Sequence, residues 1–210
     1  DRCSDGVADP VIWRREAMIR LKGRQCVGGL DLGSVSDLTA LVLLFESDDD
    51  SQSFDVLPYF WCPEVNAERR SRRDGVDYVQ WANSGFITLT EGNETDYQKV
   101  RRDIGIIADQ FGIQEIAADR LFQGAQLCQD LIRDGLNVST MGQGYVSMAA
   151  PTRWFLEQVA GGRLHHGRNP VLWWMAANAA TESDNAGGDT VLKFSKKKST
   201  EKIDGIVALC

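Results

Sequence analysis

The chain has 210 residues, of which 43% are hydrophobic and 25% charged, so it can bury a full core as one globular domain. It carries 23 basic and 30 acidic residues, and its formal net charge of −7 argues against a surface that grips nucleic acid by charge alone. No apolar run approaches membrane-spanning length and no signal-peptide pattern opens the sequence, so we expect an intracellular protein without a membrane span.

The first third of the sequence predicts one helix and three strands. A short helix is expected over residues 11–21. Residues 26–32 and 38–45 are apolar runs joined by a tight Gly-Ser turn, which is the pattern of a hairpin with a core face. Residues 54–61 alternate between apolar and polar positions and predict a third strand beside that hairpin.

The rest of the sequence alternates helical and strand patterns, which indicates an α/β fold. Helices are expected over residues 77–83, 96–111, 125–133, 147–159 and 170–181, and strands over residues 113–119 and 137–141. Between Thr181 and Ile203 the chain is polar and bears glycines around one apolar stretch, which predicts a small β-hairpin or flap.

Three aspartates, Asp31, Asp119 and Asp204, each lie inside or at the end of an otherwise apolar segment. Burying a carboxylate costs several kcal/mol unless something neutralises it. A divalent cation shared between these side chains would do so, because carboxylate oxygens are the ligands preferred by hard cations such as Mg²⁺ and Mn²⁺.

Each aspartate also has a structural interpretation. A lone aspartate after a strand is more often a helix cap or turn residue than a ligand, and Asp204 could simply cap the final helix. Asp37 lies in the turn six residues after Asp31 and is interpreted as an outer-shell residue that orients the site, with an ordinary hairpin-loop role as the alternative. The combination of three such positions is what favours a metal site.

Several short motifs occur in a characteristic order along nearly the whole chain. They are Gly29-Leu30-Asp31, Asp37-Leu38-Thr39-Ala40, Tyr78-Val79-Gln80-Trp81, Ala118-Asp119-Arg120, Met141-Gly142-Gln143-Gly144 and Lys202-Ile203-Asp204-Gly205. As an ordered set they resemble the nuclease domain of the large terminase subunit of tailed double-stranded-DNA bacteriophages. Many members of that family have an aromatic residue where this chain has Ala118, which leaves the packing beside Asp119 open.

The resemblance implies a ribonuclease-H-like fold, with a central mixed β-sheet flanked by helices. It also implies an endonuclease that cuts concatemeric double-stranded DNA during genome packaging, using two Mg²⁺ or Mn²⁺ ions held by catalytic carboxylates. Those carboxylates map onto Asp31, Asp119 and Asp204. The partners it implies are double-stranded DNA, the portal protein and the small terminase subunit, in the cytoplasm of an infected host.

The chain lacks the phosphate-binding loop of an ATPase, since it contains no Gly-Lys dipeptide. Complete large terminases carry an ATPase motor before the nuclease, so the resemblance predicts that residues 1–23 are the remnant of a linker from a missing ATPase domain and residues 24–210 are the nuclease domain. The five cysteines are scattered without a C-x-x-C pair, which favours reduced thiols over a zinc site or a disulfide scaffold.

Positive charge is gathered in two clusters despite the acidic total. One cluster is Arg69, Arg70, Arg72 and Arg73, and the other is Lys193, Lys196, Lys197, Lys198 and Lys202. The lysine cluster runs directly into Asp204, so its members are candidates for contacts with DNA phosphates. The alternative is a solvated loop. His165 and His166 are adjacent and would face opposite sides of a strand, so they are not expected to share a metal ion.

Two other functions fit the same residues. A Holliday-junction resolvase or a transposase of the same fold would use the same acidic trio, and a preference for branched DNA would identify it. In a different class, the domain would be a docking module for the portal or small terminase subunit, without nuclease activity of its own.

Overall fold

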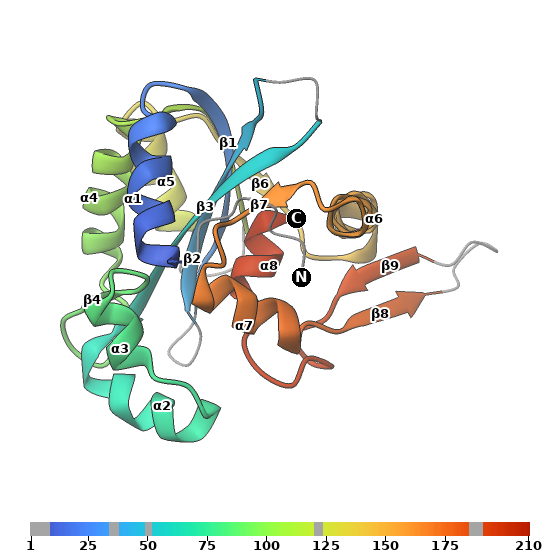
Figure 1. Cartoon of the computed structure of the whole chain (residues 1–210). Helices are drawn as coiled ribbons and strands as arrows, with labels where there is room; N and C mark the ends of the chain where they lie inside the picture. Colours follow the sequence, from blue (N-terminus) through green and yellow to red (C-terminus); the bar gives the residue numbers. More distant parts are fainter. Residues whose placement is uncertain (1–8, 34–37, 49–51, 120–123, 185–190) are drawn as a thin grey trace.

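The computed structural model describes residues 9–33, 38–48, 52–119, 124–184 and 191–210. Within these residues a seven-stranded mixed sheet runs through the centre of the molecule, with helices on both of its faces (Figure 1). A separate two-stranded hairpin projects from the body beside the sheet. This arrangement confirms the predicted α/β class with a central mixed sheet.

The sheet is built around the predicted hairpin. The strands of the sheet are β1 Gln25–Asp31, β2 Thr39–Glu46, β3 Phe54–Pro63, β4 Thr88–Thr90, β5 Gly112–Asp119, β6 Val138–Met141 and β7 Leu164–His165. The projecting hairpin consists of β8 Thr181–Asp184 and β9 Val191–Phe194. The order across the sheet is β4-β3-β2-β1-β5-β6, and β7 pairs with the other end of β3. β1, β2 and β3 are antiparallel neighbours, whereas β5 runs parallel to both β1 and β6.

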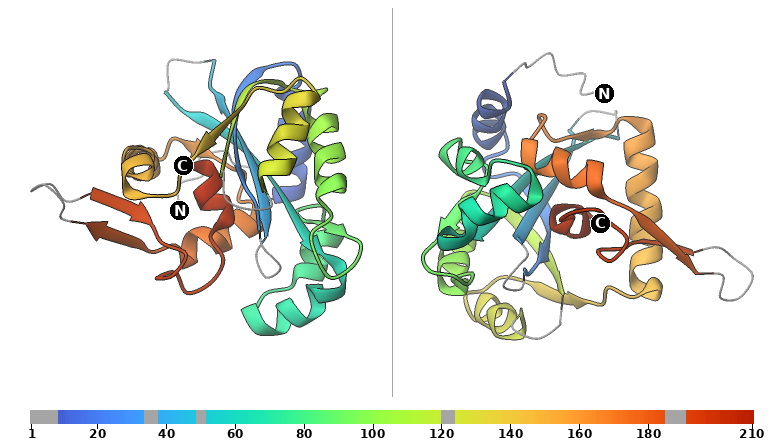
Figure 2. Two further views of the ribbon diagram at one scale, coloured as in Figure 1. Left: turned by 180° about the vertical axis from the view of Figure 1, so that it is seen from behind. Right: turned by 90° about the horizontal axis from the view of Figure 1, so that it is seen from below.

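The helices form one layer on each face of the sheet. They are α1 Pro10–Arg20, η1 Glu64–Asn66, α2 Ala67–Asp74, α3 Tyr78–Asn83, α4 Tyr97–Ala108, α5 Gly124–Arg133, α6 Tyr145–Gly161, α7 Pro170–Asn178 and α8 Asp204–Leu209. Figure 2 shows α1, α4 and α5 on one face, with α6, α7 and α8 on the other. Among the described residues, no helix is both long and apolar enough to cross a lipid bilayer.

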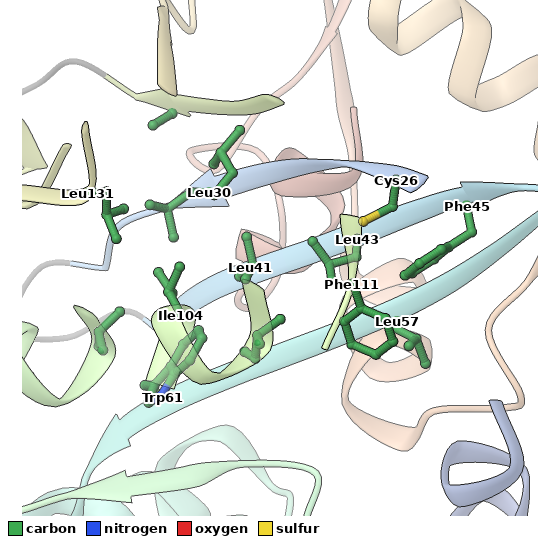
Figure 3. Close-up of a cluster of buried hydrophobic side chains, with 14 of the residues drawn as sticks. Cys26, Leu30, Leu41, Leu43, Phe45, Leu57, Trp61, Ile104, Phe111 and Leu131 are labelled. Carbon is green, nitrogen blue, oxygen red and sulfur yellow. The ribbon is translucent and has the colours of Figure 1, made fainter. Parts of the chain in front are cut away.

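The side chains of β2 explain why both faces of the sheet are covered. Leu41, Leu43 and Phe45 pack into the core beneath α1, α4 and α5, which Figure 3 shows, while Ala40 and Val42 belong to the core beneath α7 and α8. Successive side chains of a strand point to opposite faces. A strand that is apolar at every position must therefore lie between two layers of helices.

The N-terminal helix α1 packs against the sheet although it falls in the segment predicted to be a linker. Trp13, Ala17 and Leu21 are buried in the core shared with α4 and α5. Arg20 makes a two-pronged ion pair with Asp55 of β3, at 2.6 and 2.9 Å. These contacts fix α1 against β3.

Some expected elements differ from the structure. The helix predicted over residues 170–181 ends at Asn178, and Thr181 instead begins β8. The arginine-rich segment folds as α2, which no apolar periodicity had predicted, because its exposed positions are arginines and glutamate. The hairpin predicted between residues 181 and 203 is confirmed as β8 and β9.

Candidate metal centre

Two of the three predicted carboxylates lie at the same edge of the sheet because their strands are parallel neighbours. Leu30 of β1 pairs with Ala118 of β5, so Asp31 and Asp119 each end their strand at the next position. Both residues line one cavity of about 330 Å³. Asp31 is buried, with 2% of its surface exposed, whereas Asp119 is only partly buried.

The third carboxylate comes from a different layer. Asp204 occupies the first turn of α8, which packs against β1 and β2, and it is 1% exposed. Its Oδ2 accepts a hydrogen bond from the backbone N–H of Leu38 at 3.4 Å, just before β2. Chain segments 173 residues apart in sequence thus bring Asp31 and Asp204 to the same point.

A glycine allows α8 to approach β1 closely. A Cβ atom placed on Gly29 would lie 1.7 Å from the backbone oxygen of Ala208 in α8. Only glycine accommodates such an approach between two backbones. The Gly29-Leu30-Asp31 motif therefore supplies both a carboxylate and the space for the helix that carries the second one.

Replacing Gly29 with Ala is expected to lower the melting temperature by several degrees, on the order of 3–10 °C, because α8 must move away from the sheet. Gly28→Ala is the matched control, since its Cβ would meet side chains and no backbone: Leu43 at 3.1 Å, Leu41 at 3.4 Å and Ile116 at 3.5 Å. Differential scanning calorimetry of the two variants measures the difference. Equal melting temperatures for both variants would contradict this account of the packing.

A lysine joins the two buried carboxylates. Lys196 Nζ lies 2.6 Å from Asp31 Oδ2 and 2.7 Å from Asp204 Oδ1. Lys196 is on the segment between β9 and α8, so it reaches the site from the base of the projecting hairpin. A single positive charge is thereby placed between two negative ones.

The charge of this cluster is not balanced. Burial raises the pKa of Asp31 to about 7; the neighbouring Lys196 opposes that rise, while Asp204 adds to it. Burial would lower the pKa of Lys196, but the carboxylates of Asp204 and Asp31 outweigh burial and raise that pKa above its ordinary value. Above about pH 7, where Asp31 is ionised, one ammonium therefore faces two carboxylates, and the cluster attracts further positive charge.

Gln143, from the Met141-Gly142-Gln143-Gly144 motif, also contacts Asp31, a role that the sequence did not predict. Its Nε2 donates a hydrogen bond to Asp31 Oδ1 at 3.2 Å, and its backbone oxygen accepts one from Lys193 Nζ at 3.4 Å. Gln143 thus connects the hairpin strand β9 to Asp31. It follows the end of β6 by two residues, and β6 is parallel to β5, which is parallel to β1, so a residue after β6 can reach the ends of those strands; that position is the signal that could have identified it.

The sequence of nearly the whole chain matches one family model. Residues 13–210 match the model described as the terminase large subunit, endonuclease domain. The chain belongs to this family. The "Terminase, large subunit" of Enterobacteria phage HK97 is 36% identical over 188 residues, covering 89% of this chain and 36% of that protein. "Protein YmfN" of Escherichia coli (strain K12) is 29% identical over 196 residues, covering 90% of this chain and 43% of that protein.

The fold of this terminase nuclease domain also matches a solved structure. The crystal structure of the HK97 bacteriophage large terminase superposes with a TM-score of 0.80 and 34% identity, over 95% of this chain and 42% of that chain. The predicted family and the ribonuclease-H-like fold are thereby confirmed. The chain spans about two fifths of the length of these relatives.

Asp37 is a further predicted site residue of the terminase domain, whereas His165 and His166 were not expected to share a metal ion. Asp37 lies outside the described residues. His166 lines a different cavity, between α6, α7 and α8. In the part of the chain that the structure describes, no group of three histidine, cysteine, aspartate or glutamate side chains is arranged to hold a metal ion. The three-carboxylate metal site stays a prediction.

The lysines of the predicted phosphate-binding cluster have different surroundings. Lys193 pairs with Glu182 across the hairpin at 3.0 Å, and Lys196 pairs with the two buried carboxylates. Lys197 and Lys198 are exposed. Burial raises the pKa of Asp74 at the end of α2, but hydrogen bonds from Arg73 and Tyr78 bring that pKa below its ordinary value, and the nearby charge of Lys202 lowers it slightly further.

Proposed function

We propose that this terminase endonuclease domain hydrolyses phosphodiester bonds of double-stranded DNA with the help of two Mg²⁺ or Mn²⁺ ions, cutting concatemeric DNA during viral genome packaging. The observation that carries the proposal is the pair of buried carboxylates, Asp31 and Asp204, both within 2.7 Å of a single cationic atom. The ammonium of Lys196 offsets only one of the two negative charges when both carboxylates are ionised, so a divalent cation would stabilise the pair further.

The donor set fits a hard divalent cation. Asp31 and Asp204 offer carboxylate oxygens, and Asp119 stands at the end of the strand beside β1, where it lines the same cavity as Asp31. We propose that these three residues hold the ions and that Gln143 orients Asp31 through its 3.2 Å hydrogen bond. The chemistry that such ions supply is activation of a water nucleophile and stabilisation of the leaving 3′ oxygen.

The cavity beside Asp31 and Asp119 is lined mainly by apolar residues. The apolar walls of the cavity include Val42, Met148 and Ala208. Such walls exclude bulk water and strengthen each electrostatic interaction inside the site. Asp119 is only partly buried, and we propose that a phosphodiester backbone approaches the site from its side.

A plasmid assay tests the proposed activity. Purified protein is incubated with supercoiled plasmid in Mn²⁺, in Mg²⁺ and in EDTA, and we expect nicked and linear products only with a divalent cation. Cleavage in EDTA would contradict metal dependence. A branched four-way junction tested in parallel distinguishes a resolvase, which would prefer the junction to the linear duplex of the same sequence.

The proposal extends to the partners and the location of a packaging nuclease. We propose that the domain acts in the cytoplasm of the host cell, in an assembly with the portal protein and the small terminase subunit. The support is membership of the terminase large-subunit family. With a net charge of −7, the domain alone is expected to bind DNA weakly, so the larger assembly would hold the DNA in place.

Lys197 and Lys198 are proposed to contact DNA phosphates, since both are exposed next to the site. Replacing both with Ala is expected to weaken DNA binding by a similar factor for any sequence. It should also flatten the dependence of log K on log salt by up to about 2 units, roughly 0.9 for each lost contact. Fluorescence anisotropy in EDTA at several salt concentrations measures both effects.

The matched control is Arg69→Ala with Arg72→Ala, which removes two exposed charges from α2. If the salt slope changes only in this control, DNA approaches the site over α2, and the contact assigned to the two lysines is wrong.

A further inference from the structure

The ammonium of Lys196 occupies the point where the two buried carboxylates converge. Its Nζ contacts Asp31 at 2.6 Å and Asp204 at 2.7 Å. These distances are close to those between carboxylate oxygens and a bound divalent cation, about 2.0–2.6 Å. Lys196 therefore takes up oxygen atoms that a metal ion at this point would need.

The backbone beside Lys196 is fixed by hydrogen bonds. Ser195 is 4% exposed, and its N–H donates to the backbone oxygen of Ala180 at 2.9 Å. The hydroxyl of Ser199 donates to the oxygen of Ser195 at 2.7 Å and accepts from the N–H of Ala180 at 3.0 Å. This network connects the segment that carries Lys196 to the end of α7 and the start of β8.

The side chain of Lys196 is partly exposed to solvent, although its backbone is held in place. It is 37% exposed, whereas those of Asp31 and Asp204 are 3% and 1% exposed. A lysine stem has four carbons and rotates freely where it meets solvent. The ammonium can consequently move out of the site by side-chain rotation, without any movement of the hairpin.

We propose that Lys196 is a built-in competitor of the divalent cation: it holds Asp31 and Asp204 together in the cation-free protein and leaves them when a cation binds. This inference rests on the proposed function, because it concerns the same carboxylates. It gives Lys196 a role different from that of Lys197 and Lys198. The side chain of Lys196 would then determine how tightly the site binds a cation.

The physical reason is competition for the same oxygens. A cation and an ammonium repel each other, and a lone pair of a carboxylate oxygen that accepts from Nζ is not available to a metal ion. A cation must therefore displace the hydrogen bond from Nζ to Asp204 Oδ1 and the ion-pair contact of Nζ with Asp31 Oδ2 before it binds both aspartates. Contacts of this strength reduce apparent affinity by about 10- to 100-fold.

Isothermal titration calorimetry with Mn²⁺ alone tests the inference. Lys196→Met keeps a chain of similar length without the charge, and we expect it to bind Mn²⁺ about 10- to 100-fold more tightly than the unaltered protein. Lys197→Met is the matched control, because that lysine is exposed and lies next in sequence. We expect the control to change the affinity much less. An affinity in Lys196→Met that is unchanged or weaker would overturn the inference.

A second measurement on the unaltered protein covers the case in which Lys196→Met does not fold. Amine labelling followed by mass spectrometry compares Lys196 with Lys197, with and without saturating Ca²⁺. We expect Lys196 to be protected without the cation and to become labelled when Ca²⁺ binds. If Ca²⁺ binds but Lys196 stays protected, the ammonium has not left, and the inference is wrong.

The two experiments also separate this inference from the proposed function. Binding of Mn²⁺ to the unaltered protein with no gain in Lys196→Met contradicts only the competition. Absence of Mn²⁺ binding in the unaltered protein and in Lys196→Met contradicts both.

Discussion

Replacing Asp31 with Asn should reduce metal-dependent plasmid cleavage by about 1,000-fold or more, which is the scale of effect expected when a group acting directly at the reacting centre is lost. Asp31 is 2% exposed, ends the strand at the middle of the sheet and contacts both Lys196 and Gln143. An amide oxygen carries no charge to hold a cation. The rate of nicking of supercoiled DNA in Mn²⁺ measures the loss.

The same substitution should leave the fold intact. Asn has the size of Asp, and Lys196 would remain paired with Asp204 at 2.7 Å, which leaves one charge of each sign. Asp48→Asn is the control, because that carboxylate is 82% exposed and lies on the turn after β2. Full cleavage by a folded Asp31→Asn protein would remove Asp31 from the mechanism.

Mn²⁺ should raise the melting temperature of the domain by about 5–10 °C at a concentration 100 times its dissociation constant. Mass action at that ratio stabilises the native state by about 2.7 kcal/mol, and a domain of this size gains roughly 2–4 °C for each kcal/mol. The cause is binding of the cation to carboxylates that converge only in the folded protein. Scanning calorimetry across a Mn²⁺ titration measures the shift.

The control for this shift is the double variant Asp31→Asn with Asp204→Asn, which is expected to show little stabilisation by Mn²⁺. A shift of equal size in the double variant would place the bound cation elsewhere on the surface. Mg²⁺ should act in the same direction, since it prefers the same oxygen ligands.

Much of the fold follows from hydrophobic patterning. The strands around Asp31 were predictable because residues of β2 are apolar on both faces, and α4 because Val100, Ile104 and Ile107 recur at helical spacing and are buried. α2 was not predictable in this way, since its exposed arginines show no apolar stripe and its position depends on tertiary contacts such as that between Arg70 and Cys62 Sγ at 3.3 Å.

The sequence predicted the aspartates of the site but not the contacts that join them. Asp31 and Asp204 are visible as aspartates in apolar segments, and the structure places both at one point. The position of Lys196 between them has no sequence signal, because a run of lysines looks the same whether its members face solvent or a buried carboxylate. Which lysine turns inward is decided by the hydrogen bonds that fix Ser195.

The sequence separation of Asp31 and Asp204 has a consequence for the newly made protein. A ribosome adds about 5–20 residues each second, so Asp204 is synthesised roughly 9–35 seconds after Asp31. β1 and β2 can pair early, because they are adjacent in the sequence. Helix α8 follows all the strands in the sequence, so it can pack against Gly29 only after the strands have been synthesised. Unfinished chains therefore contain Asp31 without its partner, and any activity that needs both carboxylates begins only when the domain is complete.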